Sequence, residues 1–214
     1  MAISTYEDLQ SAVANWLDRT DLTSRIPEFI ALAEAAMNRQ LRVRRMVTRA
    51  TATISDAFSA VPSDYLEAKS LVISDGSTTW APDPAAPETI DDYATLGQTG
   101  QPLFFAIIGD EIRYYPAPDR SYTATLTYYA KPTALSDANT SNWILASHPD
   151  AYLYGALLAA GPFLQDQEKL STYAQLYQAA MDAISGSEKT LVGPLRTDVA
   201  RALPRTSWNM RTDI

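Results

Sequence analysis

The hydrophobic side chains of residues 1–46 recur at the spacing of two amphipathic helices. The spacing S-x-x-E makes Ser4 the expected N-cap of the first helix and Glu7 its capping-box partner. The second helix is expected to end near Arg44, because that residue would fall on the apolar stripe. These residues therefore predict a helical hairpin. Its two apolar stripes are Leu9, Val13, Trp16 and Leu17, then Ile26, Phe29, Ile30, Ala33, Met37 and Leu41.

From residue 48 the pattern changes to the Thr-rich alternation that is typical of strands. Asp75-Gly76 and Gly109-Asp110 are hairpin signals between apolar runs. We expect a compact, mainly antiparallel β-domain of six or seven strands over residues 47–131, with one short helix over residues 87–96. The strands expected are residues 48–55, 58–61, 68–74, 77–81, 103–108, 111–115 and 121–130.

Residues 132–189 return to helical spacing after a linker that ends at residue 148. Helices are expected over residues 149–164 and 165–185. Gly155 and Gly161-Pro162 should weaken or kink the first of them, and Gly186 should end the second.

The last 25 residues, 190–214, show no sustained period and contain two prolines, which predicts an extended arm. The order of elements is helices, strands, helices, arm. The predicted fold class is α+β, with the N-terminal hairpin and the C-terminal helices packed together beside the β-domain.

Composition indicates a globular protein, with 46% hydrophobic and 20% charged residues among 214. The net charge of −8 is uneven: residues 1–49 carry +1, residues 50–190 carry −11, and residues 191–214 carry +2. Such a distribution fits contacts between the ends of one subunit and the body of another better than it fits a DNA-binding domain. No signal peptide and no membrane-spanning run is visible, so we expect a soluble protein.

The sequence offers little to an active site. Cysteine is absent, which excludes disulfides and thiol chemistry, and His148 is the single histidine. The adjacent acids Asp91-Asp92 and Asp110-Glu111 fit a solvated helix start and a hairpin turn better than acid/base or Mg²⁺ sites. No phosphate-binding glycine loop is present. We expect no cofactor, no metal and no enzymatic activity, with a carboxylate-dependent glycan hydrolase as the enzymatic alternative.

Five arginines within eleven residues form the sharpest charged feature of the sequence: Arg39, Arg42, Arg44, Arg45 and Arg49. Arg39, Arg42 and Arg45 are expected on the polar face of the second helix. The tract has three interpretations, namely contacts to DNA phosphates, pairing with acidic groups of a neighbouring subunit, and a solvated helix face.

Three segments resemble the head-to-tail adaptor (connector) proteins of tailed bacteriophages, of the podovirus or siphovirus type. They are YEDLQSAVANWLDRTDLTSRIPEFIALAEAAMNRQLRVRRM, VPSDYLEAKSLVI and YYAKPTALSDANTSNWILASHPDAYLYGALLAAGPFLQDQE. The likeness covers roughly residues 5–185, and the order of the segments is more specific than any one of them.

This resemblance implies a structural virion protein of the head-tail joint, synthesised in the cytoplasm of the bacterial host. Such adaptors form a ring, usually twelvefold, that joins the portal protein to a tail protein (nozzle, stopper or tail tube) and extends the channel for genomic double-stranded DNA. It also implies that the C-terminal arm reaches the portal. The expected arm anchors are Leu195, Val199, Leu203, Trp208 and Met210.

One rival interpretation uses the arginine tract directly. A sequence-independent DNA-binding or packaging factor would contact duplex DNA through Arg39–Arg49, and its affinity would depend strongly on salt.

Overall fold

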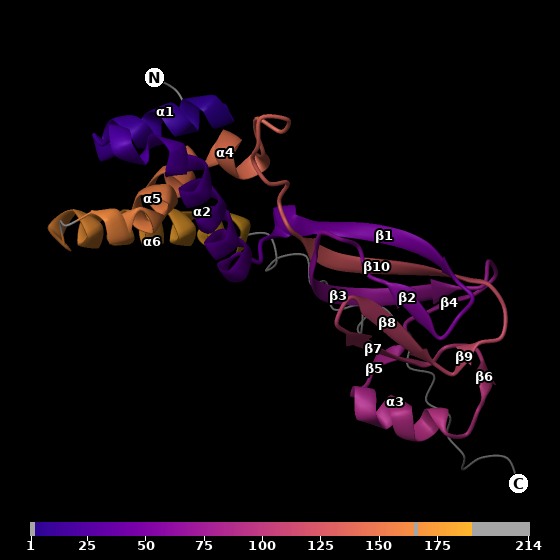
Figure 1. Ribbon diagram of the computed structural model, residues 1–214. Helices are drawn as coiled ribbons and strands as arrows, with labels where there is room; N and C mark the ends of the chain where they lie inside the picture. Colours follow the sequence, from indigo (N-terminus) through magenta and orange to yellow (C-terminus); the bar gives the residue numbers. More distant parts are fainter. Residues whose placement is uncertain (1–2, 165–166, 190–214) are drawn as a thin grey trace, which may run out of the picture.

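The computed structural model describes residues 3–164 and 167–189, which form a helical lobe and a β lobe side by side (Figure 1). Helices from both ends of the described chain make up the helical lobe, as the sequence predicts. Its elements are α1 (Tyr6–Leu17), η1 (Thr20–Arg25), α2 (Ile26–Gln40), η2 (Arg44–Met46), α4 (Trp143–Ser147), α5 (Pro149–Ala159), η3 (Gly161–Phe163) and α6 (Gln167–Lys189).

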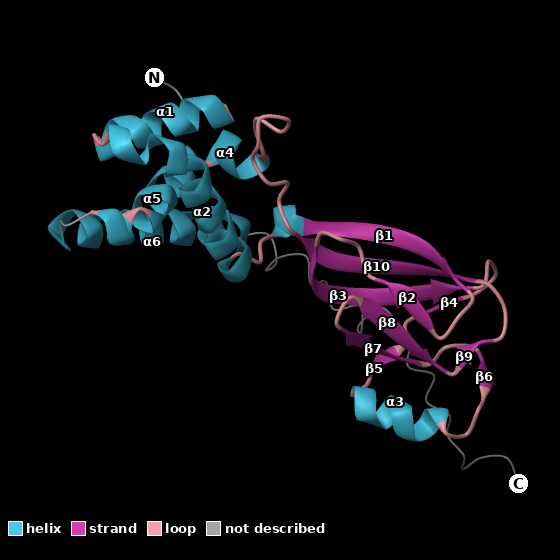
Figure 2. Ribbon diagram, viewed as in Figure 1, coloured by secondary structure: helices cyan, strands magenta, loops and turns pink. Residues whose placement is uncertain are grey.

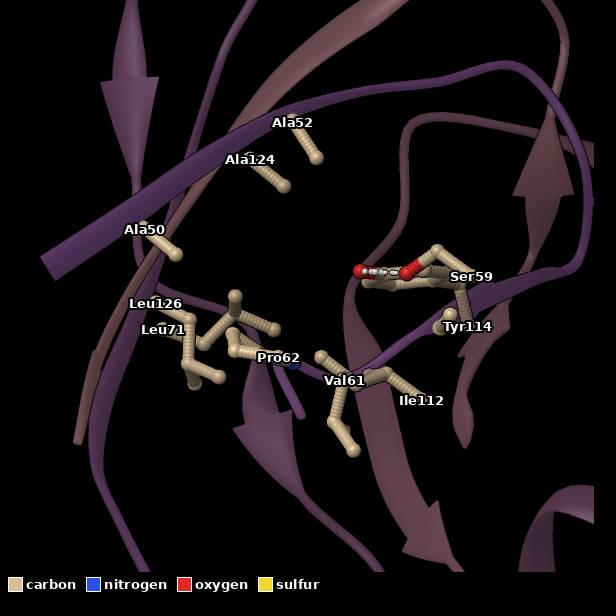
Figure 3. Close-up of a pocket in the computed structure, with 11 residues that line it drawn as sticks. Ala50, Ala52, Ser59, Val61, Pro62, Leu71, Ile112, Tyr114, Ala124 and Leu126 are labelled. Atoms are coloured by element: carbon tan, nitrogen blue, oxygen red, sulfur yellow. Dashed lines mark hydrogen bonds between the residues drawn. The ribbon is translucent and has the colours of Figure 1, made fainter. Parts of the chain in front are cut away.

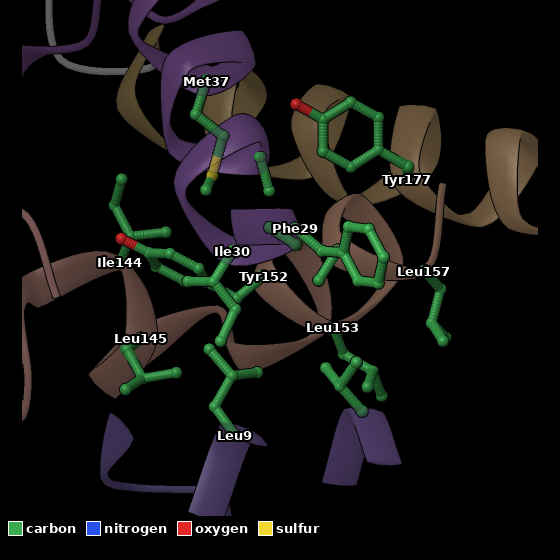
Figure 4. Close-up of a cluster of buried hydrophobic side chains, with 14 of the residues drawn as sticks. Leu9, Phe29, Ile30, Met37, Ile144, Leu145, Tyr152, Leu153, Leu157 and Tyr177 are labelled. Atoms are coloured by element: carbon green, nitrogen blue, oxygen red, sulfur yellow. The ribbon is translucent and has the colours of Figure 1, made fainter. Parts of the chain in front are cut away.

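Helix α5 is the centre of the helical lobe and contacts α1, α2 and α6. Its residues are apolar on every side, as a helix surrounded by other helices requires. Figure 4 shows Tyr152 and Leu153 of α5 among Leu9 of α1 and Phe29 of α2. All four side chains are buried in one continuous core.

Helix α1 begins one residue later than the capping signal predicted. Thr5, and not Ser4, is the N-cap, and Asp8, and not Glu7, completes the capping box. The Asp8 carboxylate accepts hydrogen bonds from the backbone N–H groups of Ser4 and Thr5 and from the Ser4 hydroxyl. These bonds, that of the Ser4 hydroxyl first, lower the pKa of Asp8. The first helical N–H, of Tyr6, donates to the carbonyl of Thr140, 2.7 Å away.

Helix α2 ends at Gln40, earlier than its apolar stripe suggests. Leu41, Val43 and Met46 are all buried in the helical core. A helix would turn Val43 about 200° away from Leu41, whereas an extended chain keeps both on one side. The backbone at Leu41 is accordingly extended. Arg42 and Arg45 therefore lie beyond the helix and not on its polar face.

Two stacked sheets and one helix form the β lobe (Figure 2). The first sheet has the strand order β1-β10-β3-β4 and the second has β2-β8-β7-β5, while β6 and β9 pair separately. The elements are β1 (Val47–Ile54), β2 (Phe58–Ala60), β3 (Tyr65–Ser74), β4 (Thr79–Trp80), β5 (Asp83–Pro84), α3 (Pro87–Ala94), β6 (Thr99–Gly100), β7 (Phe104–Ile108), β8 (Glu111–Tyr115), β9 (Ala117–Pro118) and β10 (Tyr122–Ala130).

Side chains alternate between the two faces of each sheet, so that each sheet has an inner and an outer face. Leu71 and Leu126 of the first sheet and Ile112 and Tyr114 of the second pack together between the sheets. The other face of the first sheet carries a ladder of threonines, and the hydroxyls of Thr51 and Thr125 lie 3.3 Å apart. Helix α3 covers the outer face of the second sheet through its fully buried Ile90.

The α+β class and the mainly antiparallel pairing are confirmed, and the predicted turns at Gly76 and Gly109 have positive φ angles. Short elements escaped the sequence analysis. Helix α4 lies in the stretch expected to be a linker, and the pairs β5–β7 and β6–β9 are parallel. Gly155 lies inside α5, and the helix expected over residues 149–164 ends at Ala159, just before Gly161-Pro162. The prediction that Gly186 ends the last helix is wrong, since α6 continues to Lys189.

Two segments of chain connect the lobes: residues 41–46 lead from α2 into β1, and residues 131–142 lead from β10 to α4. Because β1 and β10 are neighbours in one sheet, both segments leave the β lobe at the same place (Figure 1). No helix within the described ranges has both the length and the apolarity that a bilayer span requires.

Candidate functional site

The five arginines of the predicted tract follow the chain across the junction between the lobes. Arg39 lies in the last turn of α2, Arg42 in the connection, Arg44 and Arg45 in η2, and Arg49 in β1. All are exposed except Arg42, which is half-buried. The five arginines therefore form a band of positive charge at the junction between the lobes and not one face of a helix.

Arg42 holds the lobes together within the chain. Its Nε donates to Oε2 of Glu67 on β3 over 2.9 Å. Its Nη1 donates to the carbonyls of Asn38 and Leu41, over 2.8 and 2.6 Å, and so satisfies two of the last carbonyls near the end of α2. This side chain bridges α2 and the first sheet.

Two further arginines of the tract rest on the helical lobe. The Arg45 guanidinium lies 5.3 Å above the centre of the Trp143 ring and donates to the Ser147 hydroxyl over 3.1 Å. Arg39 lies near the phenol of Tyr177, where its charge partly offsets the rise in the Tyr177 pKa that burial causes. Arg49 faces outward from β1, opposite Thr127 of β10.

A half-buried polar network around Glu34, Tyr152 and Asn142 fixes the returning connection. The Glu34 carboxylate accepts from the Leu135 N–H over 2.8 Å and from the Tyr152 hydroxyl over 3.0 Å. Asn142 donates to the same hydroxyl over 2.6 Å, and its side-chain oxygen caps α4. Burial raises the pKa of Glu34 and also that of Tyr152.

An exposed aromatic surface lies on the helical lobe, where α1, α5 and α6 meet. Trp16 is 48% exposed, and its ring packs edge-on against Tyr154, with centroids 6.0 Å apart, and at a tilt against Tyr173, with centroids 6.3 Å apart. Leu176, one turn along α6 from Tyr173, is also exposed. We call these four side chains the Trp16 cluster. Half-exposed tryptophan among tyrosines is typical of surfaces that bind another protein.

The sequence analysis assigned Trp16 to the buried stripe of the first helix, and this assignment is wrong. Tyr6, Leu9, Val13 and Leu17 already complete that stripe in the structure. An extra large apolar residue beside a complete stripe was the signal that would have marked Trp16 as a surface residue.

A second exposed apolar surface lies at the opposite end of the molecule, on α3 (Figure 1). Tyr93 is exposed and stacks on Tyr115, with ring centres 5.6 Å apart, and it also contacts Phe104. Leu96, just after α3, is 64% exposed. Apolar contact surfaces thus lie at both ends of the long axis.

The acidic pairs and the histidine lie where they contribute to the fold, in an ion pair, a turn and a connection between helices. Asp91 pairs with Arg113 of β8, which ties α3 to the second sheet. Asp110 and Glu111 lie at the turn between β7 and β8, as predicted. The His148 backbone joins two helices: its N–H donates to Ile144 and its carbonyl accepts from Ala151. Among the described residues, no group of three or more His, Asp or Glu side chains is arranged to hold a metal ion.

The predicted arm, with its anchors Leu195, Val199, Leu203, Trp208 and Met210, lies outside the described residues. The structure therefore places the arginines of the predicted site and none of the arm.

Comparison with known proteins identifies the family. The comparison with curated proteins finds no match. The family model described as "SU10 adaptor protein" matches residues 4–198, which includes every described helix and strand. The match spans the helical lobe, the junction with its arginines, the β lobe and the first residues of the predicted arm. The chain therefore belongs to the SU10 adaptor protein family, a family of structural proteins that act as head-to-tail adaptors in bacteriophage virions.

Proposed function

We propose that the chain forms a homo-oligomeric ring, of about twelve copies as in the adaptors it resembles, between the portal and the tail. The ring extends the channel through which genomic double-stranded DNA passes. The match to the adaptor family over residues 4–198 carries this proposal. The work of the protein is adhesion, and no catalytic step is assigned to it.

Two exposed surfaces of the structure support a role in joining partners. Exposed apolar surfaces lie at opposite ends of the molecule, at the Trp16 cluster and at Tyr93 and Leu96 of the α3 end. An adaptor between two different partners needs contact surfaces facing in two directions. A ring also needs two distinct faces on each subunit that complement each other.

We assign the exposed arginines of the junction to contacts between subunits, since the rest of the chain carries a net negative charge. In this arrangement Arg39, Arg44, Arg45 and Arg49 face acidic groups of the next subunit, and Arg42 contributes by fixing the junction. The C-terminal arm contacts the portal through its apolar anchors. Tethering gives such an arm a high effective concentration, so modest contacts suffice for a firm joint.

Mixing the protein with the portal protein of the same phage tests this function. Mass photometry and electron microscopy should show a second ring added to the portal. The DNA-binding alternative predicts a different result: no added ring, and tight binding of duplex DNA that weakens steeply with salt. Salt-sensitive duplex binding without a ring would replace the adaptor proposal with that alternative.

A further inference from the structure

An apolar slot opens between the two sheets of the β lobe where β1 and β2 form their edges (Figure 3). Its volume is about 190 Å³. Ala50 and Ala52 of β1 and Ala124 of β10 point across it toward Val61 and Ile112, and the small alanines leave the space open. A cavity of about 150 Å³ is large enough for benzene, so this slot accommodates at least one aliphatic side chain.

The side chains that line the slot do not favour a polar occupant. The hydroxyls of Ser59 and Tyr114 lie at one side and already bond to each other over 2.9 Å (Figure 3). The remaining lining is aliphatic. The slot therefore suits an apolar side chain and not a hydrogen-bonding ligand.

Both strands beside the slot have an unpaired edge. In the described part of the chain β1 pairs only with β10, and β2 pairs only with β8. Most of β1 is exposed, and of the residues that commonly protect an edge strand it carries one charged side chain, Arg49, and neither proline nor lysine. Its free N–H and C=O groups are a template for an added strand.

The end of the described chain lies close to this edge. Helix α6 contacts η2, and η2 leads directly into β1 at Val47. Figure 1 shows the C-terminal, yellow end of α6 directed toward the β lobe. The 25 residues that follow Lys189 reach about 80 Å when extended, and the whole of β1 is about 26 Å long.

The composition of residues 190–214 matches the surroundings of the slot. The segment contains the aliphatic residues Leu191, Val192, Leu195, Val199 and Leu203, with four arginines against two aspartates. Residues 47–131 carry five basic and eleven acidic residues, a net charge of −6. The segment and the β lobe are therefore complementary in charge.

We propose that the slot is a docking site for the chain's own residues 190–214 in the free subunit. The segment lies along the free edge of β1 in the same direction and places Leu195 in the slot. If residue 190 starts beside Val47, Leu195 comes level with Ala52. Docking covers the exposed edge and fills the space between the sheets until a partner takes the arm.

Disulfide trapping in the full chain tests the proposal, because the natural sequence has no cysteine. Ala52→Cys lines the slot, and its neighbour Thr53→Cys is also exposed, on the opposite face of the same strand. Each is combined with Leu195→Cys and oxidised mildly. The Ala52 pair should form an intramolecular disulfide at least tenfold faster than the Thr53 pair, at a rate independent of protein concentration. Equal rates, or a disulfide found only between two chains, would overturn the proposal.

Filling the slot gives a second, independent measurement. Ala52→Leu should displace the arm and raise the rate of tryptic cleavage after Arg196 about tenfold, whereas Thr53→Leu should leave that rate unchanged. An unchanged rate in Ala52→Leu would also overturn the proposal. Neither result depends on the adaptor role, since ring formation on the portal is measured separately.

Discussion

Two buried tyrosines of the helical core differ in the hydrogen bonds that their hydroxyl groups make. The Tyr152 hydroxyl donates to Glu34 and accepts from Asn142. The Tyr177 hydroxyl is buried and has no hydrogen-bond partner among the described residues. A buried polar atom without a partner reduces stability, and one with two partners contributes to it.

We therefore predict opposite effects for the same substitution. Tyr152→Phe should lower the free energy of unfolding by about 1–3 kcal/mol, while Tyr177→Phe should leave it unchanged or raise it by up to about 1 kcal/mol. Urea denaturation followed by circular dichroism measures both. A loss larger than about 1 kcal/mol in Tyr177→Phe would show that its hydroxyl is bonded.

Glu34 makes the stability of the fold depend on pH. Its pKa in the folded chain is raised above the unfolded value of 4.5, mainly by burial. The folded state thus holds the proton to a higher pH than the unfolded state. The stabilisation that Glu34 contributes is fully present below pH 4.5 and is lost as the pH rises through the folded pKa, because the ionised carboxylate is less favourable in its partly buried site.

The variant Glu34→Gln should remove this dependence while keeping an acceptor oxygen for Leu135 and Tyr152. Unfolding free energies measured from pH 4 to pH 7 should decline less in the variant than in the natural chain. Identical slopes in the two proteins would mean that Glu34 titrates normally.

At the scale of elements, Gly155 sets how closely three helices approach. A Cβ atom at this position would lie 3.0 Å from Cβ of Ala33 on α2 and 3.1 Å from the ring of Tyr177 on α6. Gly186 lies in α6 with no atom within 4 Å of such a Cβ. The two helical glycines thus differ in the space around them.

Gly155→Val should destabilise the protein by about 1–3 kcal/mol or more, since the branched side chain overpacks the helix crossing. Gly186→Val should change stability by less than about 1 kcal/mol, because valine has a slightly higher helix propensity than glycine. The midpoints of thermal unfolding compare the two. If both variants unfold alike, the helices can separate at the crossing.

The elements also show what periodicity predicts and what it misses. Stripes of ten or more residues located α1, α2, α5 and α6, because each buries one long apolar face or is buried on all sides. Helix α4 has five residues and depends on the Asn142 cap and the burial of Ile144, which a linker composition conceals. The parallel contacts of β5 and β6 are two residues long and follow from tertiary packing alone.

The residues of the candidate site could be identified from the sequence, but their positions in the fold could not. The arginine tract was evident from its spacing, yet its path depended on where α2 ends. Burial of both Leu41 and Val43 fixed that end, and the burial of a residue depends on the rest of the fold. The Trp16 cluster joins α1, α5 and α6. The stripe of α1 could have marked Trp16 as a surface residue, but no local signal brings residues so far apart in sequence together.

At the scale of the whole molecule, we predict that the Trp16 cluster is part of the contact that joins the ring to the portal. Trp16→Glu should reduce ring assembly on the portal at least tenfold, because the charge disrupts an apolar contact that association buries. Leu32→Glu is a matched control: Leu32 is 51% exposed on α2 and lies outside the Trp16 cluster. Assembly is measured by mass photometry, with the thermal midpoint of each variant as a check on folding. Equal losses in both variants would place the contact elsewhere on the lobe.

The double connection between the lobes has a mechanical consequence. Two attachment points side by side define a line about which the lobes can bend, whereas a single linker would let one lobe swivel about the long axis. With β1 and β10 held in register over eight residue pairs, that line is anchored in the sheet itself. If the helical lobes are fixed in a ring, each β lobe can tilt toward the ring axis or away from it. Its direction around that axis stays the same.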